Sequence, residues 1–96
     1  MGLYIGCDLA GTNINAGIVD LDTGKVLGSR SIPTLGKEGQ KKVVGRMTQL
    51  IQTLIDESTN NYSPVQGVDV SAPGRLDLKI GMSSWAAYNQ NKLTED

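Results

Sequence analysis

The chain has 96 residues, 39% of them hydrophobic, which is enough for one small domain with a modest core. Nine basic and ten acidic residues are mixed along it and give a net charge of −1, which argues against a nucleic-acid partner. It has no histidine to serve in catalysis or metal binding, no signal-peptide pattern and no apolar run long enough to cross a membrane, so we expect a cytoplasmic protein without a membrane partner.

Three short strands joined by tight turns are predicted at the start of the chain. Leu3 to Asp8 is nearly all apolar, as in a strand buried on both faces, and the single cysteine within it is expected to be a buried thiol. Apolar and polar residues alternate from Ile14 to Ile18, which predicts a second strand. Turn residues at 22–24 lead into a third strand, Lys25 to Ile32, with Gly28 as a weak point or bulge. Connections this short predict an antiparallel meander.

The pattern changes after a loop at 33–39. From Gln40 the apolar residues recur at spacings of three and four, which predicts an amphipathic helix of about five turns. Its apolar stripe consists of Val43, Val44, Met47, Leu50, Ile51, Leu54 and Ile55. The polar segment Asp56 to Ser63 is expected to end the helix. Val65 to Val70 then reads as a fourth strand, which after a crossover helix is expected to pair in parallel within the same sheet.

The last part of the chain carries weaker signals. Asp77 to Gly81 is predicted to form a turn, and Trp85 to Asn91 a mixed aromatic and polar loop. A single tryptophan in a short domain favours a core or interface position.

The first turn, Asp8 to Asn13, contains residues suited to an anion. Gly11 allows a close approach of the backbone, successive N–H groups can converge on a phosphate, and Thr12 and Asn13 add side-chain donors. A carboxylate beside phosphates repels them unless a cation lies between, so Asp8 would face a hydrated Mg²⁺. Alternatively, Asp8 accepts hydrogen bonds from the turn amides as in any ordinary turn, and the turn by itself leaves both interpretations open.

The order of motifs adds to this turn. Asp8 to Asn13 is followed by Ala16 to Asp20 and, about fifty residues later, by Gly67 to Asp77 with its Ala-Pro-Gly-x-Leu-Asp sequence. Over almost the whole chain this resembles the N-terminal lobe of the ROK family (repressors, open reading frames and sugar kinases) of the actin-like ATPase superfamily. The resemblance implies an α/β fold, the N-terminal lobe of an actin-like (ribonuclease H-like) ATPase: a three-stranded antiparallel meander, a helix, then a parallel strand.

The resemblance also implies a phosphate site in the first turn. Gly11, Thr12 and Asn13 match the positions that contact the phosphates of ATP, and Asp8 matches the position that reaches magnesium through water. The sequence departs from the family at Ala10, where glycine is usual and a methyl group is tolerated only at negative φ.

A sugar site is implied at the other end of the chain. Pro73 and Gly74 match the segment beside the sugar, and Asn89 is nearest to the asparagine that bonds a sugar hydroxyl, with Asn91 as the alternative. The Leu-Pro-Gly-Trp stretch that usually follows that asparagine in family kinases is missing, although the ring of Trp85 could stack on a sugar face instead of lying in the core.

The activity implied is that of an ATP-dependent, glucokinase-like sugar kinase, a transferase of carbohydrate metabolism that moves a phosphoryl group to a hexose hydroxyl. The family's catalytic aspartate is expected beyond Asp96, so we expect no catalytic residue in this chain, a fragment that is inactive without its own C-terminal lobe. Uncovered apolar cleft surface favours a homodimer. Two alternatives stay open. One is a non-catalytic sugar-binding regulator of the ROK type, although the start of the first strand at residue 3 argues against the DNA-binding arm that such regulators usually carry. The other is another actin-like ATPase.

Overall fold

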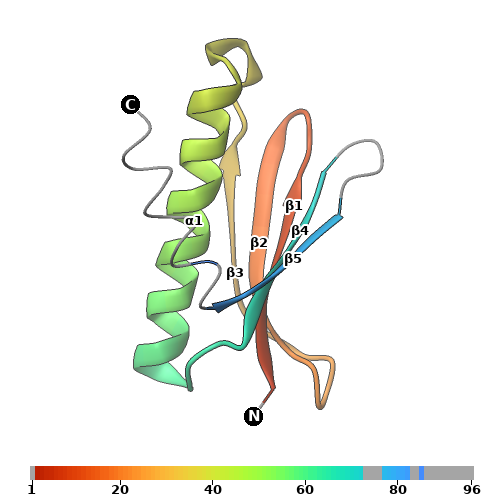
Figure 1. The fold of residues 1–96 in the computed structure, drawn as a ribbon, viewed down its shortest axis with the longest axis vertical. Coiled ribbons are helices and arrows are strands. Elements are labelled where there is room, and N and C mark those ends of the chain that lie inside the picture. The colour runs from red at the N-terminus through yellow and green to blue at the C-terminus, as the bar shows by residue number, and fades with distance from the viewer. Residues whose placement is uncertain (1, 73–76, 83–84, 86–96) are drawn as a thin grey trace.

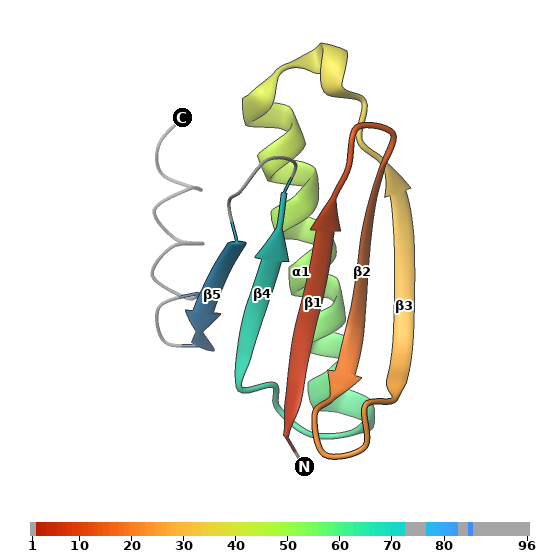
Figure 2. The same ribbon diagram turned by 90° about the vertical axis from the view of Figure 1, so that its right-hand side faces the viewer.

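The computed structural model describes residues 2–72, 77–82 and 85, in which a helix packs against one face of a five-stranded sheet (Figure 1). The elements, in chain order, are β1 (Leu3–Leu9), β2 (Asn13–Asp20), β3 (Val26–Pro33), the short 3₁₀ helix η1 (Gly36–Glu38), α1 (Gln40–Asn61), β4 (Gly67–Ser71) and β5 (Asp77–Gly81). The strand order in the sheet is β3-β2-β1-β4-β5, with α1 behind it in the view of Figure 2.

The first three strands form the predicted antiparallel meander. In the turn between β2 and β3, Gly24 has a φ of 75° and its N–H donates to the Asp20 carbonyl at 2.7 Å, so glycine is used where a side chain would be strained. The pairing of β2 with β3 shifts register between Ile18 and Val19, beside the predicted weak point at Gly28. β4 pairs in parallel with β1, which confirms the crossover.

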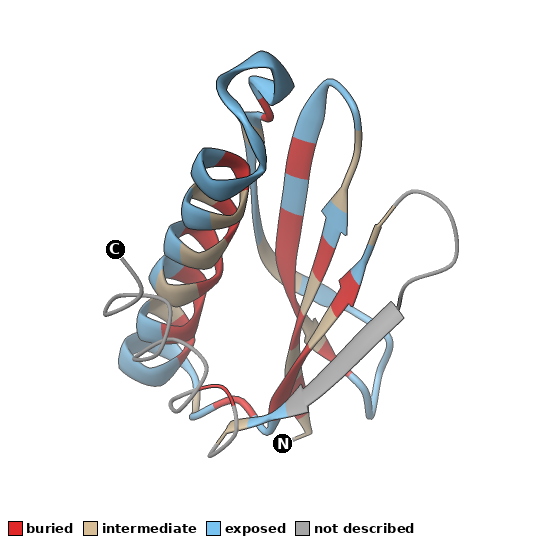
Figure 3. Cartoon of the chain, turned by 45° about the horizontal axis from the view of Figure 1, so that its top comes forward, coloured by how far each residue is buried: buried red, intermediate tan, exposed pale blue. Residues whose placement is uncertain are grey.

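Helix α1 buries the predicted stripe against the sheet, apart from Val44, which is half-buried (Figure 3). The helix ends within the polar segment 56–63 as predicted, because the last residue of α1 is Asn61. Ser58 extends the buried stripe by one turn, since it is fully buried. Its hydroxyl donates a hydrogen bond to the Ser63 carbonyl at 2.6 Å, so its polar group is not left without a partner. In the ranges that the structure describes, no helix combines the length and apolar character needed to cross a membrane.

The segment Asp77 to Gly81 is also corrected, from a turn to strand β5, which pairs antiparallel with β4. Its five residues alternate polar and apolar as a strand does, but they are too few to stand out between an aspartate and a glycine. Trp85 is 2% exposed and its indole N–H donates to Gln52 Oε1 at 3.1 Å, which confirms the core position rather than a sugar-stacking one. The rest of the predicted loop, 86–91, lies outside the described residues.

Candidate functional site

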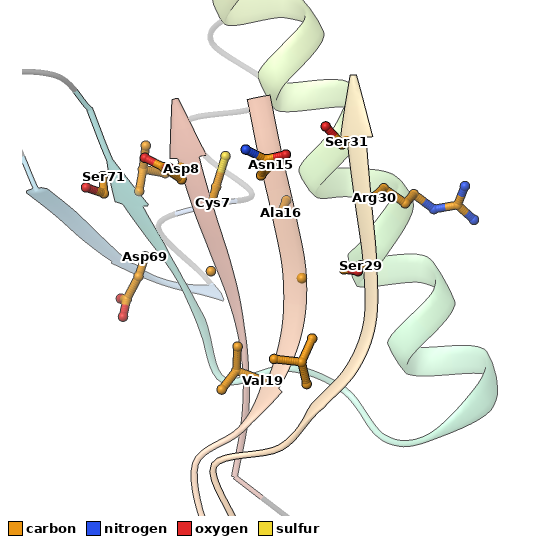
Figure 4. A pocket seen from close by; sticks show the side chains of 14 residues that line it. Cys7, Asp8, Asn15, Ala16, Val19, Ser29, Arg30, Ser31, Asp69 and Ser71 are labelled. Atoms are coloured by element: carbon orange, nitrogen blue, oxygen red, sulfur yellow. The ribbon is translucent and has the colours of Figure 1, made fainter. Parts of the chain in front are cut away.

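Four polar side chains form a row across the sheet face that α1 leaves uncovered. Asp8 of β1 is the register partner of Ser71 on one side and of Asn15 on the other, and Asn15 is the partner of Ser31. All four are exposed, and Figure 4 shows them side by side near the ends of their strands. We call Ser71, Asp8, Asn15 and Ser31 the polar row. Sequence reasoning found only Asp8, because the other three become its neighbours only once the strand pairing is known.

The polar row lies beside a hollow of about 820 Å³ in the same sheet face. The middle of the hollow is lined by Gly6 and Gly17, which are register partners on β1 and β2 and leave the backbone bare. Val19 lines the end away from the row (Figure 4), and its register partner Val26 also lines the hollow. This face therefore has a polar row at one end, two glycines in the middle with Asp69 beside Gly6, and apolar side chains at the other end.

The turn at 10–12 adjoins Asp8 and leaves hydrogen-bond donors available. It is closed by the Ala10 N–H, which donates to the Asn13 carbonyl at 3.1 Å. Gly11, Thr12 and Asn13 are exposed, and within the described part of the chain the N–H groups of Gly11 and Thr12 donate no hydrogen bond. Two unpaired backbone donors beside a carboxylate are suited to an anion that carries a cation with it.

Neither small residue of the turn is required by backbone strain. Ala10 and Gly11 both have φ outside the left-handed region, so the methyl of Ala10, a departure from the family pattern, introduces no strain. A Cβ atom built on Gly11 would meet nothing within 4 Å. Packing within the described residues therefore does not require glycine at position 11.

The acidic side chains of the described residues suit a hydrated cation rather than a cage of protein ligands. Among the residues that the structure describes, no three His, Cys, Asp or Glu side chains gather to hold a metal ion. Asp8 is an exposed carboxylate, which suits Mg²⁺ because this ion keeps several waters and takes further oxygens from phosphates. Burial, and secondly the charge of Asp8, raises the pKa of the Cys7 thiol from 9.0 to about 11. The predicted buried thiol is confirmed, and it stays protonated at neutral pH.

The three predicted sugar-binding residues, Pro73, Gly74 and Asn89, lie outside the described residues. The structure does place the start of their segment, because Ser71, two residues before Pro73, ends β4 beside Asp8. The predicted sugar segment therefore follows β4 at the end of the strands that carries the polar row.

Comparisons with solved structures give a consistent set of neighbours, whereas no family model and no curated protein matches the chain. A ROK hexokinase from Thermus thermophilus is 27% identical, with a TM-score of 0.63 over 77% of this chain and 23% of the hexokinase. A ROK family glucokinase from Streptomyces griseus, solved with glucose and AMPPNP, is 28% identical, with a TM-score of 0.53 over 76% of this chain and 21% of its own.

A third neighbour is the inorganic polyphosphate/ATP-glucomannokinase from Arthrobacter sp. strain KM. It is 32% identical, with a TM-score of 0.58 over 79% of this chain and 30% of the kinase. The chain thus spans between 21% and 30% of the length of these neighbours. With this likeness, and with its meander, helix and parallel strand, the chain has the ROK sugar kinase-like fold of the actin-like sugar kinases.

Proposed function

We propose that the chain is the N-terminal, ATP-phosphate- and sugar-binding lobe of an ATP-dependent sugar kinase that transfers a phosphoryl group to a hexose hydroxyl. The observation that carries this proposal is the exposed Asp8 carboxylate next to a turn whose Gly11 and Thr12 N–H groups are unpaired in the described structure. The neighbours support the choice of ligands, since one was solved with glucose and AMPPNP and another is named for polyphosphate and ATP.

Each residue of the turn has a role in this proposal. The N–H groups of Gly11 and Thr12, the Thr12 hydroxyl and the Asn13 amide would donate to phosphate oxygens, which positions the phosphate chain. Asp8 would hold magnesium through its waters, and the bound ion supplies neutralisation of the phosphate charge.

The sugar would lie beside the phosphates. We assign it to Pro73, Gly74 and Asn89, since the segment begins two residues after Ser71, the neighbour of Asp8. A glycine at 74 would let the backbone approach a sugar hydroxyl.

The general base and the rest of the cleft would come from the chain's own C-terminal lobe in a longer polypeptide, because the chain spans at most 30% of its neighbours. The homodimer and the cytoplasmic location expected from the sequence stay predictions.

A chimera tests the proposal. The segment of the Arthrobacter glucomannokinase that matches this chain is replaced by the corresponding residues of this chain, and hexose-dependent ADP formation is measured with MgATP. We expect ADP formation that requires hexose, since the lobe supplies phosphate positioning and part of the sugar pocket while the rest of the kinase supplies the base. The isolated chain, run in parallel, is expected to make no hexose phosphate.

Other outcomes would contradict the proposal in distinguishable ways. A folded chimera that binds glucose but forms no ADP would fit a non-catalytic, sugar-binding regulator instead. ATP hydrolysis that does not depend on hexose would point to a different actin-like ATPase. Hexose phosphate made by the isolated chain would show that the base lies within these 96 residues.

A further inference from the structure

Thr34, in the loop between β3 and η1, is bonded directly to the candidate phosphate turn. It is 5% exposed, and all three of its polar groups are engaged. Its N–H donates to the Thr12 carbonyl at 2.9 Å and its hydroxyl donates to the Ala10 carbonyl at 2.7 Å. Its own carbonyl accepts from Arg46 Nη1 of α1 at 3.0 Å. We infer that Thr34 is a positioning residue that orients the N–H groups of this turn toward a phosphate ligand, an inference that rests on the proposed function for the identity of that ligand.

The geometry of the peptide bond connects Thr34 to Gly11. The Ala10 carbonyl and the Gly11 N–H belong to one peptide unit, and the described chain contains no cis peptide. In a trans peptide the C=O and the N–H point in opposite directions. The Thr34 hydroxyl holds the Ala10 carbonyl from the protein side, so it turns the Gly11 N–H away from the protein.

The position of Thr34 is itself fixed by α1. Arg46 donates to the Thr34 carbonyl and also pairs with Glu38 of η1. Between these two contacts Leu35 has a φ of 52°, a left-handed conformation that costs a branched residue free energy and persists only where its surroundings enforce it. The two contacts of Arg46 supply that enforcement, so the turn, Thr34 and the first half of α1 form one connected unit.

A valine at this position tests the hydroxyl. Thr34→Val keeps the size of the side chain and the backbone hydrogen bonds but removes the bond to the Ala10 carbonyl. In the unliganded 96-residue chain we expect a lower ¹⁵N order parameter at Gly11. We also expect about tenfold weaker affinity for MgATP and for inorganic tripolyphosphate, which is the loss of one oriented hydrogen bond. Thr34→Ser, which keeps the hydroxyl, is expected to stay within about twofold of wild type.

Ser58→Ala is the matched control. It removes another buried hydroxyl that donates to a carbonyl, Ser63 at 2.6 Å, near the opposite end of α1. We expect it to lower thermal stability about as much as Thr34→Val but to leave Gly11 dynamics and affinity unchanged. Wild-type dynamics and affinity in Thr34→Val would overturn the inference, as would equal weakening by Ser58→Ala.

Two other outcomes also have a defined meaning. If the wild-type chain binds neither probe, the proposed function fails for this chain, while the order parameter of Gly11 still decides whether Thr34 fixes the turn. If Thr34→Val does not fold, the through-hydrogen-bond coupling between the Thr34 nitrogen and the Thr12 carbonyl carbon is measured in the wild type. Its presence supports the connection and its absence overturns it.

Discussion

Replacing Asp8 with asparagine in the glucomannokinase chimera is expected to lower kcat by about a hundredfold to a thousandfold while leaving hexose affinity unchanged. Asparagine keeps the shape of the side chain and one oxygen but not the negative charge that attracts hydrated magnesium. Asp8 is exposed near the end of β1, so the change should cost the chain little stability. The measurements are steady-state kinetics over a range of magnesium concentrations and a separate hexose titration.

Asp56→Asn is the control for Asp8→Asn. It removes the charge of another exposed carboxylate, on α1, and is expected to leave kcat within about twofold. High magnesium should restore part of the activity of Asp8→Asn, because mass action compensates for a weakened site. A kcat equal to that of the wild type at every magnesium concentration would show that Asp8 does not hold the magnesium ion.

Leu54→Ala is expected to lower the free energy of unfolding of the chain by about 3 kcal/mol. Leu54 is fully buried in the apolar stripe of α1. Small domains are stable by only about 5–15 kcal/mol, and this one packs a helix on one sheet face while a hollow remains on the other, so the loss should be a large fraction of the total. Urea unfolding followed by circular dichroism at 222 nm measures it.

Leu21→Ala deletes the same atoms at a position that is 59% exposed, in the turn after β2. We expect a change below about 0.5 kcal/mol. Equal effects of the two substitutions would mean that α1 does not pack on the sheet through this stripe.

Most of the fold could be predicted from the sequence, because the patterns that indicate its strands, turns and helix are local. The alternation in β2, the turn ending in Gly24 and the three-and-four spacing of α1 each lie within one stretch of chain, and all three predictions were confirmed. The error came at Asp77 to Gly81, where the alternation of polar and apolar residues was too short to stand out between an aspartate and a glycine. Within the polar segment 56–63, Ser58 stays buried in the helix because its hydroxyl donates to the Ser63 carbonyl.

Less of the candidate site could be predicted from the sequence. Asp8 and the turn after it stand out as a motif, but Asn15 becomes the neighbour of Asp8 only through strand register. The link between Thr34 and the carbonyls of the turn joins residues more than twenty positions apart, so no local pattern shows it. Non-local contacts of this kind had to come from the structure.

The most direct measurement of the central claim is a ¹H–¹⁵N NMR titration of the chain with AMPPNP, with and without magnesium. We predict that the largest shifts fall on the amides of Gly11, Thr12 and Asn13 and that they require magnesium in the wild type. In Asp8→Asn most of the affinity should be lost, and a higher magnesium concentration should be needed to recover the shifts. Shifts centred elsewhere on the sheet, or the same shifts without magnesium, would contradict a phosphate site in this turn with Asp8 as its magnesium residue.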